Sequence, residues 1–157
     1  MKKAYQYLTY TIAALVVVQA GAIAWAFYGL SDWINNDGGV VNKALLDDQG
    51  GELKFFAEWG FAIHMFFVGF VLIPLLSLVT LIVSFFAKVP RGSIWAAALF
   101  GLVFLQVILI PMAAREVNPI FGALHGINAL VLLGVAAMAG RRVSTAVAGK
   151  TEVPVAA

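Results

Sequence analysis

The chain has 157 residues, of which 62% are hydrophobic and only 11% are charged, whereas a soluble domain carries about 25% charged residues. So few charges cannot cover a water-facing surface. This excludes a disordered chain, an ordinary soluble enzyme and a nucleic-acid binder that relies on basic patches. Because the sequence has no cysteine, disulfides, thiolate-held metals and thiol nucleophiles are also excluded.

Four apolar stretches follow one another, at residues 5–30, 55–87, 94–114 and 119–140. Each reaches the about 20 residues that a membrane-spanning helix requires. The predicted fold class is therefore all-α, a four-helix transmembrane bundle over residues 1–142 that runs up-down-up-down. An outer loop at 31–54, with a short helix near 40–46, and a loose tail at 143–157 complete the chain. Asn118 and Pro119 predict the start of the last helix, as N-cap and first helical residue.

The charged residues predict how the bundle lies in the membrane. With the N-terminus in the cytoplasm, seven of the ten Lys and Arg fall inside and seven of the eight Asp and Glu fall outside. Because cytoplasmic loops are enriched in Lys and Arg, we expect both termini in the cytoplasm of a bacterial inner-membrane protein. The length of the first span and Gln19 in its middle favour a retained helix over a cleaved signal peptide.

The two histidines of the chain both fall inside predicted spans. Placing a polar side chain in hydrocarbon costs free energy, so such a residue indicates a structural or functional role. His64 follows the start of the second span by nine residues, and His125 follows the start of the fourth by six. At 1.5 Å per residue they lie roughly 14 Å and 9 Å below the outer helix starts. Two imidazoles at similar depth on parallel helices are what a planar tetrapyrrole iron needs. We therefore expect one haem b between His64 and His125, with both histidines as iron ligands.

Four further residues are candidates for the same site. Gly60 and Gly122 lie one helical turn before the histidines and would leave bare backbone beside a flat macrocycle. Asn128 could orient a ring or a neighbouring carbonyl. Arg115, at the outer end of the third span, is the best candidate partner for the haem propionates, because guanidinium binds carboxylate with two parallel hydrogen bonds.

Counting from the inner ends of the spans gives a conflicting depth. The stretch from His64 to Lys88 is longer than the stretch from His125 to Arg141. The difference is roughly two helical turns, or roughly 12 Å if the two inner ends are level. The sequence therefore predicts that the second span tilts, kinks at Pro74 or protrudes inward.

Each of these residues also has a plainer interpretation. The histidines could be hydrogen-bond partners between helices, and Gly60 and Gly122 could serve close helix packing. For Gln19 and Gln106, contacts between helices are favoured over a role with a quinone or a proton. Two methionines are expected to fill apolar space rather than to bind iron: Met65 and Met112.

The last two helices resemble a family of small four-span bacterial membrane proteins of unknown function. The resemblance rests on Leu124, His125, Asn128 and Ala129, followed by paired arginines at 141–142. In architecture the chain is also similar to one half of haem A synthase, which implies a haem b between His64 and His125. The chain lacks that enzyme's glutamate one turn before the first histidine, since Gly60 and Phe61 stand there, so its oxidative chemistry is not implied.

Three functions remain open at this stage. The first is a b-type cytochrome that exchanges electrons with a quinone or another redox subunit. The second is a non-redox accessory or assembly subunit of a larger membrane complex, with the histidines as hydrogen-bonding groups. The third is a haem carrier or sensor. All three place the chain in a lipid bilayer, and none involves nucleic acid.

Overall fold

The computed structural model describes residues 1–47 and 51–148, and this part of the chain is helical and without strands. It contains four helices that are long and apolar enough to cross a membrane, Lys2–Asn36, Phe56–Ala87, Gly92–Glu116 and Pro119–Ser144. The all-helical class and four helices of sufficient length and hydropathy to span a membrane are therefore confirmed. The first long helix is α1 (Lys2–Asn36), and a short helix α2 (Lys43–Asp47) follows it.

The other three long helices are built from shorter pieces. The second runs through η1 (Phe56–Glu58), α3 (Trp59–Ala62), η2 (Ile63–Leu72) and α4 (Ile73–Ala87). The third comprises α5 (Gly92–Phe104), η3 (Leu105–Leu109) and α6 (Ile110–Glu116). The fourth comprises η4 (Pro119–Phe121) and α7 (Gly122–Ala148). As predicted, Pro119 opens the fourth helix, and the Asn118 side chain accepts a hydrogen bond from the backbone amide of Ile120 at 2.9 Å.

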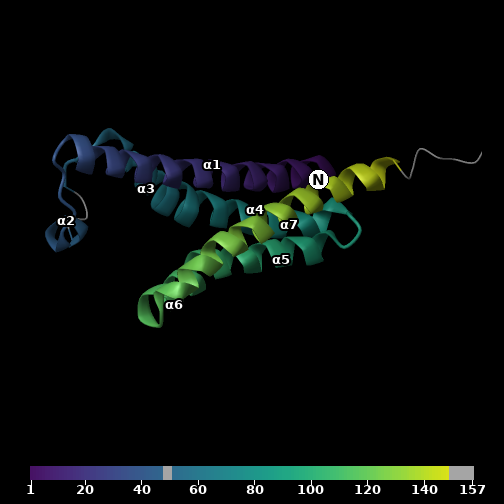
Figure 1. The fold of residues 1–157 in the computed structure, drawn as a ribbon. Coiled ribbons are helices and arrows are strands. Elements are labelled where there is room, and N and C mark those ends of the chain that lie inside the picture. The colour runs from purple at the N-terminus through teal and green to yellow at the C-terminus, as the bar shows by residue number, and fades with distance from the viewer. Residues whose placement is uncertain (48–50, 149–157) are drawn as a thin grey trace, which may run out of the picture.

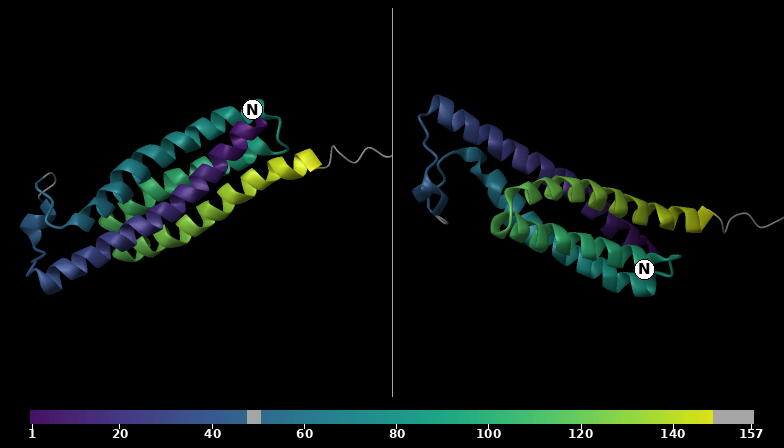
Figure 2. Two further views of the ribbon diagram at one scale, coloured as in Figure 1. Left: turned by 90° about the horizontal axis from the view of Figure 1, so that it is seen from above. Right: turned by 60° about the horizontal axis from the view of Figure 1, so that its bottom comes forward.

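The four long helices pack around one centre, but only over part of their length. α1 packs along α4 and α7, and α5 also packs along α4 and α7. Two clusters of buried side chains hold this part together, one around Ile12, Leu99 and Leu132 and one around Tyr5 and Ala96. Beyond them, α1 and α3 lean away from α6 and the start of α7, so the molecule forks (Figures 1 and 2). A cavity can therefore form where the two halves separate.

The second and third long helices each contain a widened stretch directly before a proline. The π-helical segments η2 and η3 end at Leu72 and Leu109, and Pro74 and Pro111 stand in the first turn of the α-helices that follow. A proline has no N–H and its ring collides with the carbonyl four residues earlier, so the preceding turn cannot stay regular. The predicted effect of Pro74 thus takes the form of a wide helical stretch, which contains His64.

The inner end of the fourth helix differs from the prediction. α7 continues past Arg142 to Ala148, so the first part of the tail predicted at 143–157 is helical; residues 149–157 lie outside the described part. The stretch from His64 to the end of α4 is now as long as the stretch from His125 to the end of α7. The ends of the two helices are not level, however, because Ala87 at the end of α4 belongs to one buried cluster with Ala139 and Val143, which lie before the last residues of α7. The depth difference therefore falls on the second helix, which contains the π-helical segment η2.

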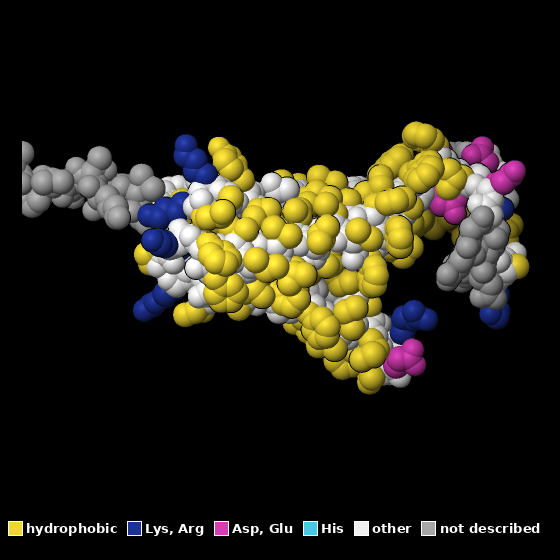
Figure 3. Space-filling model, turned by 180° about the vertical axis from the view of Figure 1, so that it is seen from behind, with side chains coloured by type: hydrophobic (Ala, Val, Ile, Leu, Met, Phe, Trp, Pro, Cys, Tyr) yellow, Lys and Arg dark blue, Asp and Glu magenta, His cyan; other side chains and the backbone are white. Residues whose placement is uncertain are grey.

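The two ends of the molecule carry opposite charge. Most of the Lys and Arg side chains in view gather at the end where α1 begins and α7 ends, whereas the Asp and Glu side chains lie at the forked end, with some Lys and Arg beside them (Figure 3). The surface between the ends is almost entirely apolar in this view. Large hydrophobic side chains are exposed along all four long helices, which fits contact with lipid rather than with water.

Candidate functional site

A cavity of about 450 Å³ lies between the two halves of the bundle, just beyond the buried core. This volume is within the about 300–1,000 Å³ typical of small-molecule and cofactor sites. All four long helices contribute to its walls, which are apolar apart from two glutamines and two histidines. The lining residues are Val16, Gln19, Ala20, Ile23, His64, Met65, Gly69, Phe70, Ile73, Val103, Gln106, Val107, Pro111, His125, Gly126, Ala129, Leu130 and Leu132.

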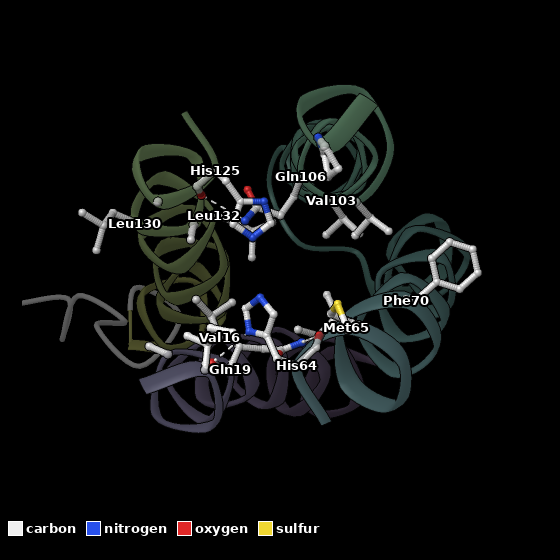
Figure 4. Close-up of a pocket in the computed structure, with 18 residues that line it drawn as sticks. Val16, Gln19, His64, Met65, Phe70, Val103, Gln106, His125, Leu130 and Leu132 are labelled. Atoms are coloured by element: carbon white, nitrogen blue, oxygen red, sulfur yellow. Dashed lines mark hydrogen bonds between the residues drawn. The ribbon is translucent and has the colours of Figure 1, made fainter. Parts of the chain in front are cut away.

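The two histidines meet in this cavity. His64 in η2 and His125 in α7 come from opposite sides of the bundle, and their rings face each other across its centre (Figure 4). The ring centroids are 5.9 Å apart and the ring planes are inclined by 50°. The structure therefore brings together the two residues that the sequence singled out.

This spacing fits a metal held between two imidazoles. Two metal–nitrogen bonds of about 2 Å each, with each ring centre about 1 Å behind its nitrogen, give a centroid spacing of about 6 Å. The described residues contain no group of three or more His, Cys, Asp or Glu that could hold a metal ion. A haem needs only two axial ligands from the protein, because its macrocycle supplies the other four.

His64 is held by Gln19 through two hydrogen bonds. The Gln19 amide donates to the His64 backbone carbonyl at 3.0 Å, and His64 Nδ1 lies 3.0 Å from the Gln19 backbone carbonyl. A carbonyl oxygen only accepts, so this contact requires the proton on Nδ1. The Nε2 lone pair is then free to act as a ligand, an arrangement common among metal-binding histidines.

The second half repeats the first of these two hydrogen bonds with its own glutamine. Gln106 in η3 donates from its amide nitrogen to the His125 backbone carbonyl at 3.0 Å. Asn128 completes the group by donating to Gln106 Oε1 at 2.7 Å and to the Leu102 carbonyl at 3.0 Å. Both glutamines therefore join two helices, as expected. The bonds that do so are the ones to the His64 and His125 backbone carbonyls.

The predicted glycines do not line the cavity. Gly60 packs against α1, where a Cβ would overlap with the Ala22 carbonyl and lie 2.9 Å from Ala26 Cβ. Gly122 is exposed, with nothing within 4 Å of a Cβ. Gly69 and Gly126 line the cavity instead. Regular helical spacing missed Gly69 because the helix is widened between it and His64, and Gly126 could have been noticed as the neighbour of His125.

The remaining candidates lie around the cavity. Asn128 is buried behind Gln106 and is not among the lining residues. Arg115 is exposed in the last turn of α6. It follows the lining residue Pro111 by four positions, which places it one turn further out on the same face of the helix. Met65 lines the cavity, whereas Met112 does not.

Comparison of the chain with protein-family models, curated proteins and solved structures found no match.

Proposed function

We propose that this chain is a b-type membrane cytochrome that binds one haem b between His64 and His125. The observation that carries the proposal is the pair of facing imidazoles, with centroids 5.9 Å apart inside an apolar cavity. The Gln19 carbonyl leaves His64 Nε2 available as a ligand. A bound haem would supply one-electron redox chemistry.

The protein residues in this proposal hold and enclose the cofactor. His64 and His125 would hold the iron together, and a haem held by two imidazoles would supply electron exchange rather than activation of a small ligand. Apolar side chains from all four helices exclude water, which tunes the reduction potential. Arg115 stands one turn beyond Pro111 and is proposed as the partner of a propionate that points outward.

The membrane arrangement is part of the proposal. We infer an up-down-up-down bundle with both termini in the cytoplasm of a bacterial inner membrane, because the Lys- and Arg-rich end belongs on the cytoplasmic side. The cavity then lies in the outer half of the bilayer. A haem at that depth needs an electron partner in reach, and a membrane quinone or another redox subunit is proposed.

The test is the visible absorption spectrum of the full chain purified in detergent, oxidised and then reduced with dithionite. We expect the spectrum of a low-spin haem b with two nitrogen ligands. His64→Ala and His125→Ala should each abolish low-spin ligation. Thr80→Ala is the control, because the Thr80 hydroxyl bonds within its own helix and Thr80 does not line the cavity, so this variant should retain the low-spin bands.

A colourless preparation that also fails to take up added haem would contradict the proposal. It would favour the alternative of an accessory or assembly subunit, in which the Gln19–His64 contacts join helices. A haem carrier or sensor would give the same spectrum and would differ from a cytochrome in the rates of haem loss and of electron exchange.

A further inference from the structure

The tight turn between α4 and α5 holds two cations in left-handed backbone conformations. Lys88, which directly follows α4, has a φ of 51°, and Arg91, which directly precedes α5, has a φ of 55°. In the described part of the chain, they are the only residues other than glycine with a positive φ. Because glycine adopts this conformation without steric cost, a lysine and an arginine in these positions indicate a role for their side chains.

Arg91 is also unfavourable for the helix that it precedes. A helix start favours a side chain that accepts a hydrogen bond from the first backbone amides, and within the described residues Arg91 gives α5 no such bond. Its positive charge also lies at the positive end of the helix dipole, whereas Lys88 lies at the negative end of α4. The formation of α5 therefore does not explain an arginine at this position.

The backbone of the turn is fixed by the buried cluster at this end of the bundle. Val89 belongs to this cluster together with Tyr5. The Gly92 amide donates to the Val89 carbonyl at 2.9 Å, and the Tyr5 hydroxyl donates to the Gly92 carbonyl at 3.1 Å. Lys88 and Arg91 are exposed, and neither forms an ion pair with any of residues 1–47 and 51–148. The turn thus presents two cations from a fixed position.

The surface next to the turn is apolar. Phe85 and Phe86 in the last turn of α4 are 68% and 63% exposed, and Ile94 in the first turn of α5 is 64% exposed. In a chain that spans a membrane, such side chains contact lipid tails, which places the turn at the level of the lipid headgroups. Most of the Lys and Arg side chains in view lie at the same end (Figure 3). A ligand with acyl chains and an anionic headgroup complements both parts of this surface.

We propose that this turn binds an anionic phospholipid. Lys88 and Arg91 attract its phosphate group, and Phe85, Phe86 and Ile94 contact its acyl chains. A Lys or Arg near an anionic membrane surface increases the affinity about fivefold. A phospholipid whose headgroup also carries a cation has no net charge and therefore binds less tightly. This binding involves neither the cavity nor the haem, so it does not depend on the proposed function.

The test is a competition between phosphatidylglycerol and phosphatidylcholine with the same acyl chains, added in equal amounts to the full chain in detergent. Native mass spectrometry counts the adducts of the two lipids, which differ in mass. We expect the phosphatidylglycerol adduct to exceed the phosphatidylcholine adduct about 25-fold, at about fivefold for each cation. An excess of inorganic phosphate should not displace phosphatidylglycerol, because phosphate has no acyl chains to contact the apolar surface.

Substitutions in the turn locate the effect. Lys88→Gly and Arg91→Gly should each lower the ratio of the two adducts about fivefold. The melting temperature should not fall, because glycine suits the positive φ at both positions, and this shows that the variants are folded. Arg91→Lys keeps the charge and should keep the ratio.

Lys3→Gln is the matched control. Lys3 is an exposed cation at the same end of the molecule. It precedes the buried Tyr5 by two residues, which places it on the side of α1 that faces away from the bundle. Its removal takes the same charge from the chain and should leave the ratio of the two adducts unchanged.

Equal amounts of the two adducts on the wild-type chain would overturn the proposal, and this comparison needs no variant. A wild-type ratio in the double variant Lys88→Gly with Arg91→Gly would overturn it as well. So would a loss in Lys3→Gln as large as in Arg91→Gly, because the attraction would then belong to the whole basic end rather than to the turn. Displacement of phosphatidylglycerol by inorganic phosphate would show a site for a free anion instead of a lipid.

Discussion

A glycine in this bundle matters for stability where its backbone touches a neighbouring helix. Gly60 lets α3 approach α1, because a Cβ there would lie 2.9 Å from Ala26 Cβ and 3.1 Å from the Ala26 backbone nitrogen. Backbone contact of this kind is a common basis of helix association in membranes, where the hydrophobic effect gives little drive. Gly122 has no such neighbour, although it precedes its histidine in nearly the same way.

Gly60→Ala is therefore expected to destabilise the protein, whereas Gly122→Ala is not. The added methyl group at position 60 must push α3 away from α1, at a cost of about 1–3 kcal/mol in the free energy of unfolding. The same change at position 122 meets open space and reduces the freedom of the unfolded chain, which stabilises by about 0.4–1 kcal/mol. Unfolding in mixed detergent, followed by circular dichroism, measures both. Equal effects of the two substitutions would contradict this assignment of Gly60.

Among the helical elements, the widened segments η2 and η3 set the positions of His64 and Gln106. Gly69 lies within the first of them. A Cβ at this position would overlap with the His64 carbonyl and would lie 2.9 Å from the Gln19 amide nitrogen. The hydrogen bond between Gln19 and the His64 carbonyl thus depends on the absence of a side chain at position 69.

Gly69→Ala should break this contact and shift His64. We expect a loss of about 1–3 kcal/mol of stability from the overlap, together with weaker axial ligation if the proposed haem is bound. Gly126→Ala is the matched control, because Gly126 also lines the cavity and its Cβ would meet nothing within 4 Å. Melting temperatures and the reduced absorption spectrum of both variants provide the measurement. Wild-type values for Gly69→Ala would show that the widened segment is not required.

Asn128 joins the third and fourth long helices, because its amide bonds both Gln106 and the Leu102 carbonyl. Asn128→Leu removes both bonds at similar volume, and we expect it to lower the free energy of unfolding by about 1 kcal/mol. Thr80→Val is the control, since the Thr80 hydroxyl bonds to Leu76 in its own helix. Denaturation in mixed detergent measures the free energy of unfolding of both variants. Similar losses for both would argue against a link between helices at Asn128.

For the whole molecule, the separation of charge leads to a prediction about membrane orientation. Because the chain has no cysteine, single cysteines report on one position at a time. Val40→Cys lies beyond α1 at the forked end, and Pro90→Cys lies in the turn between α4 and α5. We expect a membrane-impermeant maleimide added to intact cells to label position 40 and not position 90. Labelling of position 90 alone would reverse the proposed orientation.

Much of the fold could be predicted from the sequence, because the signals were long and local. Four apolar runs predicted the four helices, and Asn118 with Pro119 marked the start of the last one. The inner end of α7 was missed because the paired arginines 141–142 were taken as the end of the span. A spanning helix can continue into water, and composition does not mark where it stops.

The candidate site was predicted in part. The scarcity of polar residues inside the spans drew attention to His64, His125 and the two glutamines, and the structure places all four around one cavity. Helical spacing put Gly60 on the same face as His64, but spacing does not tell which neighbour a helix face meets. For Gly60 that neighbour is α1 rather than the cavity.

The sequence alone determined that four apolar helices would form and that two histidines would lie within them, because hydropathy and helix length are local properties. Only the tertiary structure decided that the two halves fork, that the imidazoles face each other with centroids 5.9 Å apart, and that the Gln19 and Gln106 amides donate to the backbone carbonyls of the two histidines. These features depend on how residues far apart in the chain meet across the bundle, as Gln19 and His64 do. Such contacts are set by the packing of whole helices and leave no pattern in any single segment.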